Sequence, residues 1–239
     1  MIQEKLKGLL VIFLAVAAAS DVSSVSAAPV QETEQRFHPV WSSTGMVATQ
    51  EKLASKAGAA ILADGGTAVD AAVAVGFALA VTLPKAGNLG GGGFMVLWLS
   101  KEKKAIAINY REKAPLIASR DMYLDAQGNV DKFKATKSYL STGVPGTVAG
   151  LVLAQENYGT LPLKRVLMPA IGLAENGFVV TRELSSSITG ARNRLYPDPA
   201  SRAKFFHKDG TPLQPGDLLV QKELAATLKL IAEKGAPGF

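Results

Sequence analysis

A run of glycines and the arginine that follows it are the residues of this sequence that point most directly to chemistry. Four consecutive glycines lie within the motif GNLGGGGF at residues 87–94, and Arg111 follows seventeen residues after Phe94. Consecutive glycines let two stretches of backbone approach where no Cβ would fit. An arginine at the end of a predicted strand presents a planar fork of donors that matches a carboxylate. Together these residues predict a binding site for a small acid.

Arg111 has two interpretations. Most exposed arginines are solvated or paired with a nearby acid, and Glu112 and Asp121 are available as partners. However, Arg111 is expected to share a strand face with two alanines and an asparagine, which leaves room for a ligand. Its guanidinium could then hold a carboxylate through two parallel hydrogen bonds. The residues alone leave both interpretations open.

The glycine run does not match a nucleotide-binding loop. The pattern GxGxxG would need a glycine at Met95 or Val96, and no Lys-Ser/Thr pair follows as in a P-loop. Those motifs also lead from a strand into a helix, whereas this run leads from a predicted helix into a predicted strand. The alternative is close backbone packing, or a bend where a strand begins.

No complete catalytic apparatus is visible in the 239 residues. The chain has no cysteine, which removes thiol nucleophiles and thiolate metal sites. His38 and His207 have no partner at metal-ligand spacing, so both are predicted to be ordinary surface residues. There is no GxSxG elbow of a serine hydrolase. The sequence therefore indicates no catalytic residue, no metal and no cofactor.

Hydrophobic periodicity and capping signals predict a mainly helical chain. The segment 71–83 is apolar on all sides, and the motif TAVD at residues 67–70 has the spacing of a capping box, so we expect a buried core helix there. Pro169 is expected to bend or shorten the helix that contains it. A loop rich in proline and charge is expected over residues 196–217. The other predicted helices cover residues 50–64, 146–157, 163–176, 181–195 and 221–234.

Two strands are expected between the first and second groups of helices. Residues 94–99 form a continuous apolar run that predicts a buried strand, and residues 104–111 alternate as its partner. Two strands do not make a stable sheet alone, so the remaining strands are expected beyond Phe239. The predicted class is a layered α+β domain that is incomplete in this chain.

The N-terminus has the features of a secretory signal peptide. Lys5 and Lys7 precede an apolar core at residues 8–19, and small residues lead to a cleavage site after Ala27. A core of twelve residues is short for a bilayer span, so a permanent membrane anchor is the weaker alternative. The predicted mature chain covers residues 28–239 and is periplasmic or secreted.

Composition narrows the possible partners. The net charge is +6, but the basic residues are scattered among acids and aromatic residues make up only 7% of the chain. Nucleic-acid binding proteins concentrate basic residues in a patch or stripe. The composition therefore argues against a nucleic-acid partner.

An ordered set of motifs along the chain resembles the bacterial γ-glutamyltranspeptidase family, also called glutathione hydrolase. The resemblance covers nearly all of the predicted mature chain, and its specificity comes from the order of the whole set. The motifs are FHP (37–39), GMVA (45–48), GGTAVDAAVA (65–74), AGNLGGGGFM (86–95), YREKAP (110–115), DMYLD (121–125), GVPGTVAG (143–150), YG (158–159) and NGF (176–178).

The resemblance implies an N-terminal-nucleophile hydrolase with an αββα sandwich, made as a zymogen that cuts itself into a large and a small subunit. An N-terminal threonine of the small subunit would attack the γ-glutamyl amide of glutathione or a related compound. Water, an amino acid or a dipeptide would then accept the γ-glutamyl group. The partners implied are these substrates and acceptors, and the small subunit from the same precursor.

Only one functional residue of that family maps onto this chain. Arg111 matches the arginine that binds the α-carboxylate of the γ-glutamyl group, while the nucleophilic threonine has no counterpart in the 239 residues. The chain therefore resembles the N-terminal part of the large subunit, and we expect it to be inactive alone. Two alternatives stay open: a related acylase that removes glutaryl groups from β-lactams, and a non-catalytic exported binding module.

Overall fold

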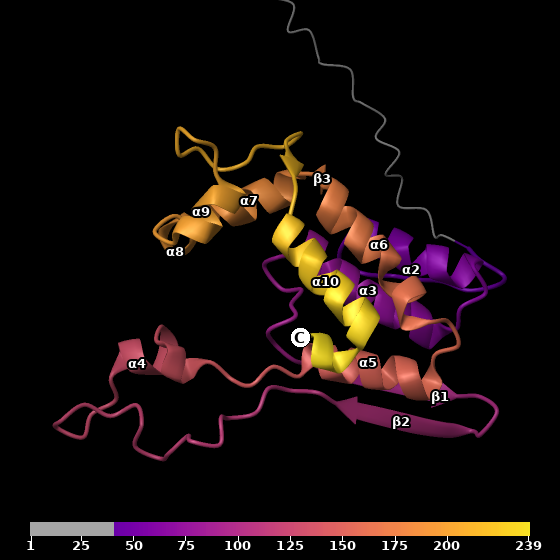
Figure 1. Cartoon of the computed structure of the whole chain (residues 1–239), viewed down its shortest axis with the longest axis horizontal. Helices are drawn as coiled ribbons and strands as arrows, with labels where there is room; N and C mark the ends of the chain where they lie inside the picture. The colour runs from indigo at the N-terminus through magenta and orange to yellow at the C-terminus, as the bar shows by residue number, and fades with distance from the viewer. Residues whose placement is uncertain (1–40) are drawn as a thin grey trace, which may run out of the picture. The chain divides into compact units, whose positions relative to one another are not determined.

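An apolar helix, α3 (Ala68–Thr82), is the centre of the computed structural model, which describes residues 41–239. Ten of its fifteen residues are buried, as the absence of a polar face predicts, while Ala68 and Ala72 are exposed. It packs against α2 (Lys52–Ala63), α5 (Thr147–Tyr158) and α6 (Leu163–Asn176), and Figure 1 shows these helices side by side. The predicted core helix is thus confirmed. The predicted signal peptide and His38 lie outside the described residues.

The last long helix, α10 (Lys222–Lys234), packs against α6 and completes this helical layer. Gln221 precedes it and connects three helices: its backbone N–H donates to the carbonyl of Ala174 at 2.9 Å, and its Nε2 donates to the carbonyl of Val81 at 2.9 Å. Val81 lies in the last turn of α3, where carbonyls have no partner inside the helix. Gln221 therefore caps α3 from outside.

The capping box that the sequence predicts at the start of α3 is present and belongs to a larger network. Asp70 is fully buried, and its carboxylate accepts hydrogen bonds from Thr67 on its own helix. It also accepts bonds from Gln155, Thr160 and Leu161, which lie at the end of α5 and in the following loop. The carboxylate thus joins the start of α3 to the end of α5.

The charge of Asp70 is retained despite its burial. Burial by itself raises the pKa of this carboxyl, but the hydrogen bonds from Thr67, Gln155 and Leu161 outweigh it and hold the pKa well below its ordinary value. Gln155 donates through Nε2 to both Asp70 and the carbonyl of Leu161, while its buried Oε1 has no hydrogen-bond partner among residues 41–239. The side chain of Gln155 is thus oriented by the two acceptors.

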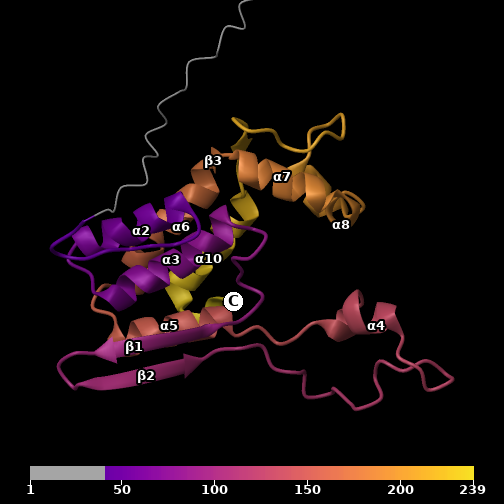
Figure 2. The ribbon, with the colours of Figure 1, turned by 180° about the vertical axis from the view of Figure 1, so that it is seen from behind.

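Two antiparallel strands, β1 (Phe94–Leu99) and β2 (Lys104–Asn109), form the larger of two small sheets. Phe94 pairs with Asn109 at one end and Leu99 with Lys104 at the other. Figure 2 shows this hairpin running along α5, which contacts β2. The chain is therefore a mixed α/β structure that is mostly helical over its described residues.

The prediction that residues 94–99 form a buried strand was wrong for one face of β1. Leu97 is buried and Met95 is half-buried on the side of α5, but Phe94, Val96 and Trp98 are each more than 60% exposed. An all-apolar strand is typical of a sheet covered on both faces. Within residues 41–239, only one face of β1 is covered.

Pro169 lies inside α6, which keeps its full predicted length, so the proline does not shorten the helix. Two predictions about the second half of the chain need correction. The helix expected over 181–195 divides at Ala191 into α7 (Arg182–Gly190) and α8 (Arg192–Leu195). The loop expected over 196–217 contains α9 (Pro199–Phe205), which begins with an Asp198 cap and a proline in its first turn.

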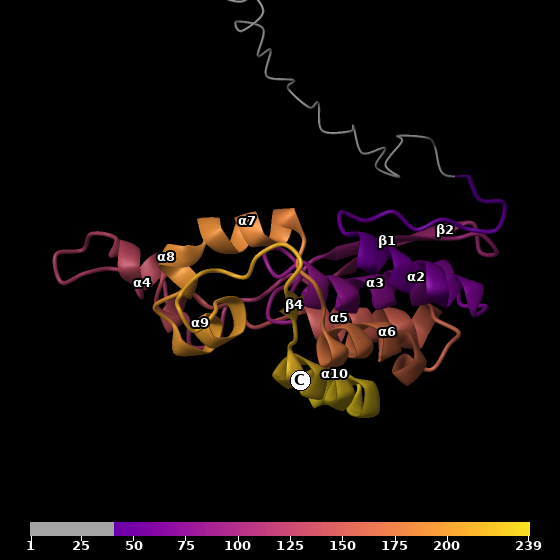
Figure 3. The same cartoon turned by 90° about the horizontal axis from the view of Figure 1, so that it is seen from above.

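Figure 3 shows α7, α8 and α9 following one another at one end of the described part of the chain. After the break at Ala191, the guanidinium of Arg192 lies 4.4 Å from the ring centre of Tyr196 and donates to the carbonyl of Gly210 at 2.6 Å. The remaining short elements are α4 (Lys132–Thr136), β3 (Phe178–Val179), β4 (Leu218–Leu219), η1 (Tyr139–Ser141) and η2 (Ala236–Gly238).

Candidate functional site

Arg111 lies just beyond β2, where the chain leaves the sheet. Its backbone N–H donates to Oδ1 of Asn109 at 3.1 Å, so the end of the strand fixes the backbone at this point. Its side chain is 65% exposed, and its Nε lies 3.6 Å from the carboxylate of Glu112. One of the two acids considered from the sequence is thus its neighbour, while Asp121 pairs with Arg120 instead.

An open cavity of about 420 Å³ begins at Arg111 and lies between the end of β2 and the first turns of α5. Its lining is mostly apolar, with the two cations Arg111 and Lys113 at the edge. The lining residues are Ile108, Asn109, Tyr110, Arg111, Lys113, Val144, Pro145, Gly146, Ala149, Gly150 and Leu153. A pocket of this size could hold a small acid whose carboxylate meets the guanidinium.

The contact between Arg111 and Glu112 does not preclude this chemistry. Both side chains are solvent-accessible, and a separation of 3.6 Å between Nε and the carboxylate oxygen is longer than a charge-assisted hydrogen bond. An exposed pair of this kind contributes little free energy. The terminal nitrogens of Arg111 have no partner among the hydrogen bonds and ion pairs of residues 41–239.

The glycine run packs against Tyr110, the residue before Arg111. A Cβ at Gly92 would lie 2.6 Å from the carbonyl oxygen of Tyr110, and one at Gly93 would lie 2.8 Å from its ring. No glycine within residues 87–93 has a positive φ, so Gly92 and Gly93 are needed for space and not for unusual backbone angles. Close backbone packing, the alternative to a phosphate loop, is the interpretation that fits.

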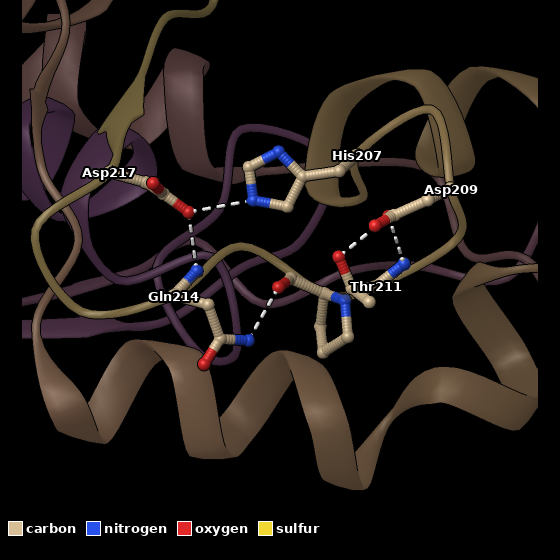
Figure 4. A network of polar contacts seen from close by, with 6 residues as sticks. His207, Asp209, Thr211, Gln214 and Asp217 are labelled. Atoms are coloured by element: carbon tan, nitrogen blue, oxygen red, sulfur yellow. Dashed lines mark hydrogen bonds and ion pairs between the residues drawn. The ribbon is translucent and has the colours of Figure 1, made fainter.

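His207 belongs to a polar network within its own loop. Its Nε2 lies 2.8 Å from the carboxylate of Asp217, which also accepts from the backbone N–H of Gln214 at 2.6 Å (Figure 4). That backbone bond is the main cause that lowers the pKa of Asp217. Thr211, the nearest hydroxyl in Figure 4, donates to Asp209 and not to the imidazole. The network braces the loop between α9 and β4.

Within the part of the chain that the structure describes, no three acidic or histidine side chains gather as a metal site would require. Over the same residues, no helix has both the length and the apolar character needed to cross a bilayer.

Comparison with known proteins identifies the family to which these features belong. A family model described as gamma-glutamyltranspeptidase matches residues 54–239, which is most of the chain. The chain belongs to the γ-glutamyltranspeptidase family. The glutathione hydrolase proenzyme of Escherichia coli strain K12 is 50% identical over 206 residues, which cover 86% of this chain and 35% of that relative.

Two further γ-glutamyltranspeptidase-like proteins show the range of the similarity. The crystal structure of Helicobacter pylori gamma-glutamyltranspeptidase superposes with a TM-score of 0.81 at 46% identity, covering 84% of this chain and 58% of that one. The acylase ACY 1 proenzyme of Pseudomonas sp. strain V22 is 43% identical, covering 82% of this chain and 36% of the acylase. The chain thus spans about a third of the length of the curated relatives it matches.

The sequence predicted Arg111 as a site residue, and it did not indicate which segment lies across the cavity that Arg111 lines. The motif GVPGTVAG was interpreted as the start of a helix and as a marker of the resemblance, although Gly146 and Gly150 are also one helical turn apart and face Tyr110. Paired glycines at that spacing, with the glycine run of residues 87–93, were a signal that two backbones meet there. The sequence did not indicate which backbone lies between them.

Proposed function

We propose that the complete protein hydrolyses the γ-glutamyl amide bond of glutathione and related compounds, and transfers the γ-glutamyl group to amino acid or dipeptide acceptors. The family match over residues 54–239 carries this proposal. The relatives that share about half of the residues of this chain include a glutathione hydrolase proenzyme. The cavity beside Arg111 has the size and charge that a small γ-glutamyl compound needs.

In this proposal Arg111 holds the α-carboxylate of the substrate. Its side chain is accessible at the edge of an apolar cavity, and its backbone is fixed by Asn109. A guanidinium in this position can form two parallel bonds to a carboxylate, which sets both the position and the direction of the substrate. The γ-carbonyl would then point away from Arg111 toward the reacting group.

The reacting group in the proposal is an N-terminal threonine, made when the precursor cuts itself. Its hydroxyl oxygen attacks the γ-carbonyl, the amide C–N bond breaks, and the leaving amine takes the hydroxyl proton through the threonine α-amine. Backbone N–H groups stabilise the oxyanion. Water or an acceptor amine then cleaves the γ-glutamyl ester. No threonine of residues 1–239 is assigned this role, so we propose that the chain alone is inactive.

We further propose that these residues are the N-terminal part of a large subunit, whose αββα sandwich is completed by the rest of the precursor. The exposed apolar face of β1, formed by Phe94, Val96 and Trp98, supports this proposal, since such a face is usually covered. Leu116 and Ile117 are also almost fully exposed, on the long loop that follows Arg111. An exported, periplasmic or secreted protein is proposed from residues 1–27 alone.

The acylase relative favours a second candidate, the removal of glutaryl groups from β-lactams. The two candidates differ in whether the substrate carries an α-amino group. Turnover of a γ-glutamyl anilide and of a glutaryl anilide by the complete gene product separates them. Release of aniline from the first alone supports the γ-glutamyl activity, whereas comparable or faster release from the second would replace it with the acylase.

A further inference from the structure

Tyr110, the residue before Arg111, lies between the glycine run and the start of α5. A Cβ at Gly146 would lie 2.1 Å from the carbonyl oxygen of Tyr110, and one at Gly150 would lie 2.3 Å from its Cβ. On the other side, a Cβ at Gly92 would lie 2.6 Å from the same carbonyl oxygen. Only glycine fits at these three positions without moving Tyr110.

Hydrogen bonds join the two segments on either side of Tyr110. The backbone N–H groups of Gly146 and Thr147 both donate to the carbonyl of Gly91, at 2.8 and 3.1 Å. The backbone N–H of Tyr110 donates to the carbonyl of Gly93 at 3.0 Å. The glycine run is therefore bonded to the start of α5 and to the end of the hairpin, so that the three segments form one unit.

A bond between two side chains also joins the glycine run to the start of α5. The hydroxyl of Thr147 donates to Oδ1 of Asn88 at 2.6 Å, and the side chain of Thr147 is buried. The N-terminus of α5 has no side-chain cap, so the hydroxyl of Thr147 is not used to cap the helix. The carboxamide of Asn88 can approach because a Cβ at Gly91 would lie 2.6 Å from its Oδ1.

We propose that Asn88 and Thr147 are positioning residues for substrate binding: their bond holds the glycine run against α5, and the glycines hold Tyr110 so that Arg111 faces the cavity. This inference rests on the proposed function, because it assigns supporting residues to the same site. A bidentate contact fixes both the position and the direction of the guanidinium, so a displacement of Arg111 weakens its hold on the carboxylate. Neither residue touches the substrate in this account.

The test uses Thr147→Val in the complete gene product, with a γ-glutamyl anilide as substrate. Thr147→Val keeps the shape of the side chain and removes the hydroxyl, and we expect KM to rise about 5- to 10-fold with kcat changed less than about twofold. Thr147→Ser restores the hydroxyl and is expected to return KM to within about twofold of the wild-type value. Thr189→Val is the control, because Thr189 makes a comparable bond to the carbonyl of Ser185 within α7.

A double-mutant cycle with Arg111→Ala separates positioning from general destabilisation. If Thr147 acts through Arg111, Thr147→Val changes KM by less than about twofold when Arg111 is already alanine. An equal KM increase in both backgrounds, or no increase in the wild-type background, would overturn the inference. If Arg111→Ala itself leaves KM unchanged, the proposed role of Arg111 fails and the inference fails with it, so the two failures are distinguishable.

Discussion

The buried carboxylate of Asp70 provides a quantitative test of how the helices are held together. It accepts hydrogen bonds at 2.6 to 3.1 Å from Thr67, Gln155, Thr160 and Leu161. Hydrogen bonds to a charged group are worth about 1.5 to 3 kcal/mol each, but their contributions do not add. Asp70→Ala would also leave buried donors without partners. We therefore expect a loss of about 3 to 5 kcal/mol in the free energy of unfolding.

Thermal unfolding of the complete gene product, followed by circular dichroism, measures this loss. In a complete protein of roughly 600 residues, with an unfolding entropy of about 2.1 cal/mol/K per residue, a loss of about 3 to 5 kcal/mol lowers Tm by about 2 to 4 °C. Asp209→Ala is the matched control, because the carboxylate of Asp209 bonds only to Thr211 in an exposed loop. The control should change Tm by less than about 0.5 °C. Equal shifts for the two variants would refute the reasoning.

The contribution of Asp70 also has a defined pH dependence. Because the pKa of Asp70 is lower in the folded chain than its ordinary value, its stabilising effect is fully present above about pH 4. The effect is lost as the pH falls from there toward the folded pKa. The Tm difference between the wild-type protein and Asp70→Asn should therefore be constant from pH 5 to pH 7 and narrow below about pH 4. A difference that widens with acidification would contradict this assignment.

Two further predictions concern glycine and glutamine positions in the helical layer. Gly159→Ala should lower Tm and reduce the free energy of unfolding by about 1 to 3 kcal/mol, because the new Cβ would lie 2.2 Å from Nε2 of Gln155. Gly172→Ala is the control: its new Cβ meets no atom within 4 Å, so Tm should stay unchanged or rise. Gln221→Leu should lower the free energy of unfolding, measured with a denaturant, by about 1 to 2 kcal/mol, because the carbonyl of Val81 loses its hydrogen-bond donor. An unchanged midpoint would contradict this prediction and would show that water replaces the amide.

Local patterns were enough to predict most helices of this chain. The helix 163–176 was predicted with the observed bounds, and the capping box at Thr67 formed as its spacing requires. The break at Ala191 was missed because it depends on the contact of Arg192 with Tyr196, which no local pattern records. The helix α9 was missed although the dipeptide Asp198-Pro199 is a start signal, because the surrounding composition resembled a loop.

The exposed face of β1 and the site show a different limit of sequence reasoning. An apolar run such as residues 94–99 predicts a strand, but it does not tell whether residues of the same chain cover both faces of that strand. At the site, the sequence identified Arg111 and the glycine run as separate features. Their relation through Tyr110, Gly146 and Thr147 depends on long-range packing between segments that are more than thirty residues apart.

The central claim is that Arg111 binds the α-carboxylate of a γ-glutamyl substrate. The most direct measurement compares kcat/KM for a γ-glutamyl anilide and for the analogue without the α-carboxylate, using the wild-type complete gene product and Arg111→Ala. We predict that removing the carboxylate costs the wild-type protein at least about 30-fold, corresponding to about 2 kcal/mol, and costs Arg111→Ala less than about threefold. Equal losses in both proteins would contradict the claim.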